Sequence, residues 1–347
     1  MLIVSHSADA SGHHRAGHPE RPERIAAAMA GIEDLDLGSE LRIVHGVPAD
    51  RAQLAAVHSE SYLDELAAFC HGGGGDLDPD TYATEESWSA AQAAAGAGLT
   101  AIEELRRSDQ GVAFVPARPP GHHALRDRAM GFCLLNNIAV AAAALLADGE
   151  RVLIVDWDVH HGNGTQEIFW DEPNVLYLST HQWPLFPGSG RASEIGGPHA
   201  AGRTVNMPLP PGATGDLVRR AIDEIALPVV DAFAPTWVLV SAGFDAHRAD
   251  PMADLALSSG DFADLAKTVA GFAPSPGRLA LFLEGGYDLG AVRASVAATI
   301  GAVRDSSYVT EKPTSGGPGI EMVRQAKAER ANAARRSDPV ILPGDLL

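Results

Sequence analysis

Short runs of β-branched and aliphatic residues recur along the chain, and each run is continuous instead of alternating with polar residues. This pattern is typical of strands that are covered on both faces, as in a parallel sheet. The predicted strands are residues 2–4, 112–115, 152–155, 175–178, 237–240 and 279–283.

Helical segments lie between these strands, at residues 22–29, 61–69, 85–107, 135–146, 216–231, 261–272 and 291–303. The alternation predicts an α/β fold, a single three-layer domain with a mainly parallel central sheet. No clear repeat or linker interrupts residues 1–305, which are therefore expected to form one domain. From residue 306 the composition shifts to Gly, Pro, Ala and Arg, which predicts a tail over 306–347 with a peripheral helix and loose ends.

Composition and charge narrow the class of protein. The 347 residues carry a net charge of −19, and nucleic-acid binding is excluded because it needs a surplus of Lys and Arg. Cationic partners are favoured instead. Cys70 and Cys133 form no CxxC pair, so neither a disulfide framework nor a cysteine zinc site is expected. Residues 1–10 lack the basic start of a secretory signal, and the apolar residues 134–147 are too few to span a bilayer, so we expect no membrane association and a cytoplasmic location.

Acidic and histidine side chains gather where the strand over 152–155 ends. In an extended segment alternate residues point the same way, so Asp156, Asp158 and His160 share one side. Because the carboxyl ends of parallel strands meet at one edge of a sheet, Asp245 after another apolar strand, residues 237–240, can join them. Asp158, His160 and Asp245 then form the open ligand set of a catalytic zinc. His247 lies two residues after Asp245 and is a further candidate ligand, so the possibility of a second metal ion stays open.

Adjacent histidines and one tyrosine add candidate catalytic groups. His122 and His123 follow a stiff Pro-Pro-Gly turn, and two neighbouring imidazoles suit a hydrolysis that moves a proton from water to a leaving amine. Each ring needs an orienting acceptor, for which Asp156 and Asn163 are available. Tyr287, beside two glycines, can donate a hydrogen bond to a developing oxyanion. A tyrosine in that setting is more typical of turn packing when taken alone, and its weight comes from the other groups.

Together these motifs resemble the zinc-dependent histone deacetylase family, class II-like members in particular, including bacterial histone deacetylase-like amidohydrolases and acetylpolyamine amidohydrolases. The resemblance covers roughly residues 1–305, the deacetylase-like catalytic domain. It is carried by residues 18–22, 118–124, 131–133, 136–139, 156–164, 186–190, 241–251 and 284–287. It implies a fold of the arginase/deacetylase type.

The resemblance also assigns roles within the catalytic centre. Asp158, His160 and Asp245 match the ligands of one catalytic Zn²⁺. His123 matches the main general base and acid, with Asn163 as its partner where class I-like members have Asp, and His122 matches an electrostatic helper paired with Asp156. Tyr287 matches the catalytic tyrosine. The matching ligands of a structural K⁺ or Na⁺ are Asp156, Asp158, His160, Ser179 and Thr180.

A channel for the acyl-lysine stem is implied by Gly131, Phe132 and Phe186, with Met252 beside it. The implied reaction hydrolyses the acyl amide of acetyl-lysine or a related acylated amine and releases acetate and a free amine. Zinc and Tyr287 would polarise the carbonyl while His123 activates water. The partner is then an acetylated lysine peptide or protein, or an acetylated polyamine, and a homo-oligomer is left open.

The alternatives concern the substrate and the class of protein. Apolar Met252 follows Asp250-Pro251 where polyamine deacetylases of the eukaryotic branch carry an acid, which argues against that mode of selection. Asp76, Asp78 and Asp80 offer acids elsewhere, although a solvated loop is the favoured interpretation. An arginase-like manganese ureohydrolase would hold two metal ions instead of one zinc. A non-catalytic acyl-amide binder on the same fold is the third alternative.

Overall fold

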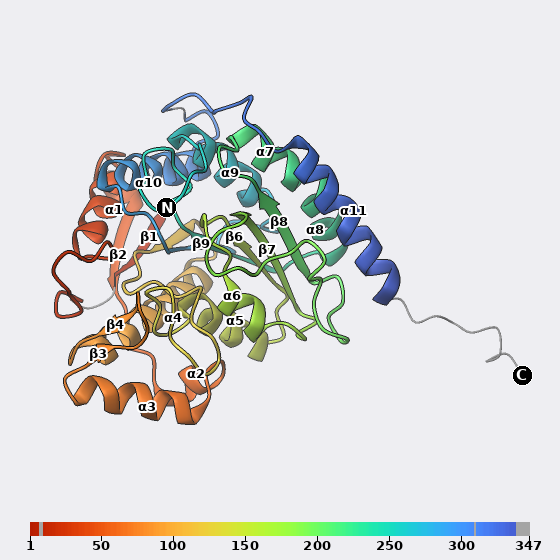
Figure 1. The fold of residues 1–347 in the computed structure, drawn as a ribbon. Helices are drawn as coiled ribbons and strands as arrows, with labels where there is room; N and C mark the ends of the chain where they lie inside the picture. Colours follow the sequence, from red (N-terminus) through yellow and green to blue (C-terminus); the bar gives the residue numbers. More distant parts are fainter. Residues whose placement is uncertain (7–9, 309, 338–347) are drawn as a thin grey trace, which may run out of the picture.

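Eight strands form one sheet in the computed structural model, which describes residues 1–6, 10–308 and 310–337 (Figure 1). The sheet order is β2-β1-β5-β10-β9-β6-β7-β8, and each neighbouring pair is parallel. The strands are β1 (Leu2–His6), β2 (Leu41–His45), β5 (Val112–Val115), β6 (Val152–Asp156), β7 (Val175–Gln182), β8 (Thr204–Leu209), β9 (Trp237–Ala242) and β10 (Leu279–Leu283). A separate two-stranded hairpin pairs β3 (Gly75–Asp76) with β4 (Tyr82–Ala83).

The six predicted strands are confirmed, and they occupy the six interior positions of the sheet. The two edge strands were not predicted, because neither has a continuous apolar run. β2 places Arg42 and His45 in solvent, and β8 contains Asn206 and Pro208. Proline lacks the N–H that a central strand needs, and it is tolerated at an edge.

Helices cover both faces of the sheet, which confirms the α/β three-layer prediction. The helices are α1 (Glu23–Glu33), α2 (Arg51–Ala55), α3 (Glu60–His71), α4 (Ser87–Ser108), α5 (Asn137–Ala147), α6 (Asn163–Ile168), α7 (Gly215–Ala221), α8 (Leu227–Phe233), α9 (Ser259–Ala270), α10 (Leu289–Arg304) and α11 (Ile320–Ser337). A short 3-10 helix (Gly38–Glu40) precedes β2, and a π-helical segment (Ile222–Ala226) joins α7 to α8. Helices α2 and α6 were not predicted.

Alternate residues of the interior strands point into separate cores. Leu153 and Val155 of β6 belong to the core shared with α1, α7, α9 and α10, whereas Val152 and Ile154 belong to the core shared with α3, α4 and α5. Figure 1 shows these two helix groups on opposite sides of the sheet. Burial on both faces is the reason that these strands are apolar throughout.

The tail contains one long helix that lies along the edge of the sheet. α11 runs beside β8 (Figure 1), and its Val323 and Ala326 are buried in the core. Arg330 donates hydrogen bonds to the carbonyls of Gly202 and Thr204, next to and on that edge strand. The helix thus covers an edge that would otherwise be open to another strand. A domain boundary at residue 305 stays a prediction, and the predicted loose end over 338–347 lies outside the described residues.

Removing the apolar contact of α11 should lower stability. We expect Val323→Asp to lower the free energy of unfolding by about 3 kcal/mol, because it buries a charge without a partner. Ala328→Asp is the matched control, since Ala328 is exposed on the same helix. Urea unfolding of both variants checks this expectation, and equal midpoints would contradict the packing role of α11.

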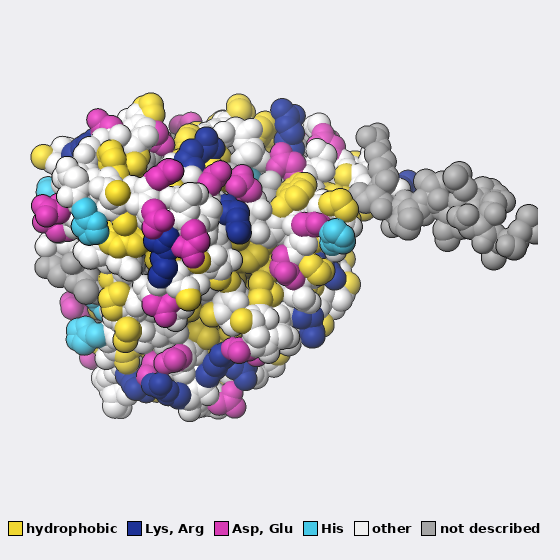
Figure 2. Space-filling view, turned by 90° about the horizontal axis from the view of Figure 1, so that it is seen from below, with side chains coloured by type: hydrophobic (Ala, Val, Ile, Leu, Met, Phe, Trp, Pro, Cys, Tyr) yellow, Lys and Arg dark blue, Asp and Glu magenta, His cyan; other side chains and the backbone are white. Residues whose placement is uncertain are grey.

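Surface charge and hydropathy give two further observations. On the face shown in Figure 2, the described Lys and Arg side chains are interspersed with Asp and Glu and form no continuous basic surface there. None of the helices in the described ranges combines the length and the apolar character that crossing a membrane requires.

Candidate functional site

Three neighbouring strands bring the candidate residues to one edge of the sheet. β6 pairs with β7 on one side and with β9 on the other, so that Asp156 lies opposite Ser179 and Ser241. β9 also pairs with β10. The loops that follow β6, β9 and β10 therefore start side by side. The loop after β6 carries Asp158 and His160, the loop after β9 carries Asp245, and the loop after β10 carries Tyr287.

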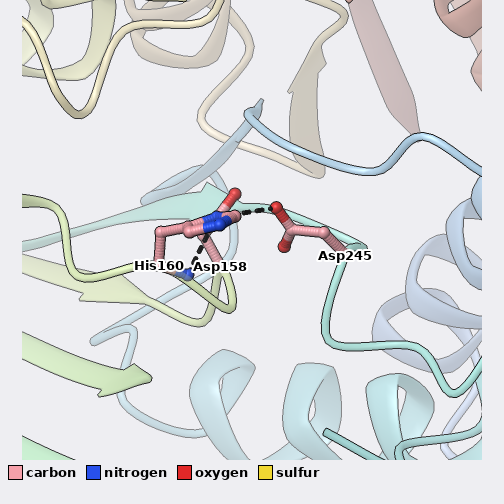
Figure 3. A group of neighbouring side chains, drawn as sticks. All are labelled: Asp158, His160 and Asp245. Atoms are coloured by element: carbon pink, nitrogen blue, oxygen red, sulfur yellow. Dashed lines mark hydrogen bonds and ion pairs between the residues drawn. The ribbon is translucent and has the colours of Figure 1, made fainter. Parts of the chain in front are cut away.

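Asp158, His160 and Asp245 form a compact buried group, called the candidate metal group below (Figure 3). Their candidate ligand atoms all lie within 4.8 Å of one another. His160 Nδ1 is 3.1 Å from Asp158 Oδ1 and 3.2 Å from Asp245 Oδ2. The other oxygen of each carboxylate accepts a backbone N–H: Asp245 Oδ1 from Val159 at 2.9 Å, and Asp158 Oδ2 from Gly285 at 2.8 Å. These bonds aim the remaining oxygens at one point.

The group fits a divalent metal ion. Asp245 Oδ2 is buried and, apart from its 3.2 Å contact with His160 Nδ1, makes no hydrogen bond, an arrangement that a cation would stabilise. Burial and then the nearby Asp158 raise the pKa of Asp245 to about 7. Burial lowers the pKa of His160, but its two carboxylate neighbours outweigh burial and raise that pKa to about 10. Both shifts indicate a site that takes up positive charge. A Cβ on Gly285 would lie 2.0 Å from Asp245 Oδ2, so glycine leaves the approach open.

His247 does not join this group. Its Nδ1 accepts the backbone N–H of Ala249 at 3.1 Å, which fixes a turn instead of facing the carboxylates. Among the described residues, one set of His, Cys, Asp and Glu side chains has the spacing of a metal site, and it contains Asp158, His160 and Asp245.

The two adjacent histidines meet the acceptors that the sequence offered. His122 Nδ1 lies 3.0 Å from Asp156 Oδ2, and His123 Nδ1 lies 2.8 Å from Asn163 Oδ1. The amide oxygen of Asn163 can only accept, so His123 carries its proton on Nδ1 and keeps a lone pair on Nε2. The ring centroids of His123 and His160 are 5.8 Å apart, which places the His123 ring beside the candidate metal group.

Opposite charge states are favoured for the two rings. Burial lowers the pKa of His122, but Asp156, Asp158 and Glu284 outweigh burial and raise the pKa to about 10. Burial and the neighbouring His122 and His160 hold the pKa of His123 well below its usual value. A neutral and a charged imidazole side by side separate the roles of base and electrostatic partner.

Glu284 holds the histidine turn in place, a role that the sequence analysis missed. Its Oε2 accepts the backbone N–H groups of Gly121 at 2.7 Å and His122 at 3.1 Å, and its Oε1 accepts the Ser241 hydroxyl at 3.0 Å. It is fully buried, and burial raises its pKa to about 7. The signal in the sequence was an acid directly after an apolar strand, which is unusual unless the acid is paired.

A cavity of about 190 Å³ opens onto this site. Its polar lining includes His122, His123, His160 and Tyr287, and its apolar lining includes Phe132, Leu185, Phe186 and Met252. Gly131 also lines it, and a Cβ there would lie 2.5 Å from the His123 ring. Around one opening the structure thus brings together the predicted channel residues, both adjacent histidines, Tyr287 and the candidate metal ligand His160.

Phe132 lies in the left-handed region of the backbone, with φ of 67°. A bulky side chain rarely adopts this conformation, so it needs support from its surroundings. The Phe132 N–H donates to Thr81 Oγ1 at 3.0 Å, and the His18 ring packs edge-on against the phenyl ring with centroids 4.6 Å apart. No local pattern around Phe132 predicted this conformation.

Asp76, Asp78 and Asp80, the acids considered as polyamine contacts, are called the rim acids here, and only one of them lines the cavity. Asp76 pairs with Arg15, and Asp78 Oδ1 accepts the backbone N–H groups of Asp80 at 2.9 Å and Thr81 at 2.6 Å. Asp80 lines the cavity beside Gly131 and Phe132. Two of the acids considered as polyamine contacts therefore serve the loop itself.

The residues matched to a monovalent cation lie on β6, on β7 and in the loop after β6, and they include Asp158 and His160 of the candidate metal group. Ser179 and Thr180 are buried on β7. Ser179 Oγ is within 2.9 Å of His181 Nδ1. Asp156 Oδ1 accepts the Asp158 N–H at 3.2 Å, and Tyr177 donates its hydroxyl to Asp156 Oδ2 at 3.0 Å. Tyr177 is a second partner of Asp156 that the sequence analysis missed.

Comparison with known proteins gives a consistent result. The model of the "Histone deacetylase domain" family matches residues 18–303. "Histone deacetylase 10, chloroplastic" of Oryza sativa is 38% identical over 326 residues, covering 86% of this chain and 72% of that protein. "Histone deacetylase-like amidohydrolase" of Pseudomonas aeruginosa is 38% identical over 277 residues, covering 78% and 73%. The solved "Crystal Structure of HDA15 HD domain" superposes with a TM-score of 0.85 at 32% identity, covering 97% of this chain and 98% of that one.

Proposed function

The chain belongs to the histone deacetylase family, and from this membership we propose that it is a zinc-dependent hydrolase of acyl amides. The substrate we assign is acetyl-lysine in a peptide or protein, or a related acylated amine, and the products are acetate and the free amine. The observation that carries this proposal is one cavity lined by the histidine pair, by Tyr287 and by His160, which belongs to the candidate metal group.

Asp158, His160 and Asp245 would hold the zinc ion. Two carboxylates and an imidazole are a ligand set that leaves room for water and substrate. Zinc bound there supplies Lewis-acid chemistry, polarising a carbonyl and acidifying water. Asp156, Asp158, His160, Ser179 and Thr180 would surround a K⁺ or Na⁺ that stabilises the same loop, an assignment that rests on the family resemblance.

The two adjacent histidines have different roles in the proposed reaction. His123 is neutral, so its Nε2 can accept a proton from the attacking water and later donate it to the departing amine. The Asn163 contact fixes the ring and its tautomer. Charged His122, held by Asp156, stabilises negative charge that develops beside it.

Tyr287 would donate its phenolic hydrogen bond to the developing oxyanion. Burial and the carboxylates of Asp245 and Asp158 raise the pKa of Tyr287 well above its usual value, although Arg24 opposes them, so the phenol keeps its proton. A protonated donor beside the cavity is what this role needs.

Tyr287→Phe should lower kcat by about 10²- to 10³-fold, because it removes one preorganised donor to the transition state. The zinc content and the unfolding midpoint should stay at the wild-type values, since the ring still packs against Phe132 at a centroid distance of 5.8 Å. Steady-state kinetics on an acetyl-lysine peptide and metal analysis check this. An unchanged kcat would exclude Tyr287 as the donor.

The shape and charge of the opening support a thin chain as substrate. Phe132, Leu185, Phe186 and Met252 offer an apolar lining to a methylene stem. A polyamine carries further ammonium groups, and of the rim acids Asp80 alone lines the cavity while Arg15 neutralises Asp76. This balance favours acetyl-lysine, while Asp80 keeps an acetylated polyamine as the second candidate.

A substrate panel tests the proposal. The zinc-loaded chain would be assayed on acetyl-lysine peptides, N-acetylputrescine, N-acetylspermidine and longer acyl-lysines, with zinc and manganese counted per chain. We expect one zinc ion and the highest kcat/KM on an acetyl-lysine peptide. Preference for acetylated polyamines would select the second candidate, two manganese ions would indicate an arginase-like enzyme, and binding without turnover would indicate a non-catalytic binder.

A further inference from the structure

Asp250 is a buried carboxylate that the reaction described above does not use. It lies in the loop after β9 and is 6% exposed. Its Oδ2 accepts the backbone N–H of Tyr287 at 2.6 Å and that of Asp288 at 3.1 Å. Its Oδ1 accepts the N–H of Met252 at 3.1 Å. One side chain therefore joins the loop after β9 to the turn after β10.

The turn that carries Tyr287 is held at several successive residues. Arg24 donates from Nε to the Gly286 carbonyl at 2.6 Å. Asp250 takes the next two N–H groups, and Asp288 Oδ1 caps α10 by accepting the Ala291 N–H at 2.8 Å. Gly286 has φ of 118°, a conformation open to glycine, so the turn has little intrinsic preference for this shape. The hydrogen bonds to Asp250 join this turn to the loop of the metal ligand Asp245, as does the Phe244 N–H, which donates to the Gly285 carbonyl at 3.0 Å.

Asp250 itself is not among the described residues that line the cavity, whereas Tyr287 and Met252 both are. Any effect of Asp250 on the reaction must therefore pass through the residues that it holds. Hydrogen bonds from backbone N–H groups to an ionised carboxylate are stronger than those between neutral groups, and stronger still away from water. Such bonds can fix the phenolic oxygen within the narrow range that a transition-state donor requires.

We infer that Asp250 is a positioning residue for Tyr287. It sets where the phenolic hydroxyl lies relative to the metal group, and it does so through the backbone of the Tyr287 turn. This inference rests on the proposed function for its consequence in catalysis. Its structural content, that Asp250 fixes the environment of the Tyr287 ring, is independent of that function.

A double-mutant cycle separates positioning from general support of the fold. We expect Asp250→Ala to lower kcat on an acetyl-lysine peptide by about 10- to 100-fold when Tyr287 is present. In the Tyr287→Phe background the same change should lower kcat by less than about twofold, because the hydroxyl that it misplaces is already gone. Asp250→Asn, which keeps one acceptor oxygen, should lie between wild type and Asp250→Ala. KM is expected to change by no more than a few fold, because Asp250 also holds the backbone of Met252, which lines the cavity.

Asp261 provides the matched control. It is also fully buried and accepts backbone N–H groups, from Ser258 at 2.9 Å and Thr314 at 3.0 Å, but it lies on α9 away from the cavity lining. Asp261→Asn should lower the unfolding midpoint and leave kcat within about twofold of wild type, since kcat reports only on folded protein.

A second readout needs neither zinc nor turnover. The chain has 5 tyrosines, so fluorine NMR of 3-fluorotyrosine-labelled protein resolves few signals, and Tyr287→Phe identifies one of them. Asp250→Ala should shift or broaden that signal, and Asp261→Asn should not.

Equal losses of kcat in the two backgrounds, or an unchanged Tyr287 fluorine signal in Asp250→Ala, would overturn the positioning role. If the zinc-loaded wild type turns over no acyl amide, the proposed function fails, and the fluorine signal still decides whether Asp250 positions Tyr287.

Discussion

Asp245→Asn is expected to lose its zinc and at least about 10³-fold in kcat/KM, because one of three ligands becomes a neutral, weak donor and the Lewis acid leaves with it. The metal-free protein should keep its fold. In wild type without metal, Asp245 and Asp158 are two buried carboxylates within one small group, and the raised pKa of Asp245 reports the cost of ionising it there. Replacing the carboxylate by an amide removes that cost.

Stability measurements sharpen this prediction. A zinc concentration about one hundred times Kd should stabilise the wild type by about 2.7 kcal/mol and the Asp245→Asn variant by much less. Metal analysis and thermal unfolding with and without zinc measure both effects. Asp254→Asn is the control, since Asp254 is an exposed acid further along the same loop. Wild-type zinc content and turnover in Asp245→Asn would refute the assigned ligand set.

His123→Ala is expected to lower kcat by about 10³-fold, within the range that general acid–base catalysis contributes. His123 is the neutral member of the pair, and its Nε2 lone pair is free because Nδ1 donates to Asn163. His122 is the charged member, so His122→Ala removes charge stabilisation instead of the base and should lower kcat less than His123→Ala does.

Single-turnover rates of the two alanine variants, each with its zinc content determined, compare the roles directly. Both variants should retain zinc, because neither imidazole belongs to the group of candidate ligands. Equal rates for the two variants, or a slower His122→Ala, would contradict His123 as the main base.

The interior of the fold was predictable from the sequence because burial on both faces leaves a local mark. Each residue of β9 is buried, for example, and the strand is apolar over its first four residues. The edge strands β2 and β8 lack that mark. β2 has exposed side chains at Arg42, Ile43 and His45, and β8 is buried but interrupts its apolar residues with Asn206 and Pro208, so neither shows a continuous apolar run.

The candidate site likewise contains residues that local sequence patterns predict and residues that they do not. Asp158 and His160 were predictable because they lie two residues apart after a strand, and Asp245 because it follows a neighbouring strand. The partners of Asp250 and Glu284 were not, because their hydrogen bonds join residues 37 and 163 positions apart, and no local pattern encodes them. The rim acids were ambiguous for a related reason: whether Asp76 is free depends on Arg15, which lies 61 positions away.

The most direct test is the release of acetate from an acetyl-lysine peptide by the zinc-loaded wild-type chain, beside Asp245→Asn purified in the same way. We expect one acetate and one free lysine amine per turnover from the wild type, with the rate rising to saturation at one zinc per chain, and no acetate above background from the variant. Acetate release at the same rate from both proteins, or from neither, would contradict a zinc-dependent deacetylase with Asp245 as a ligand.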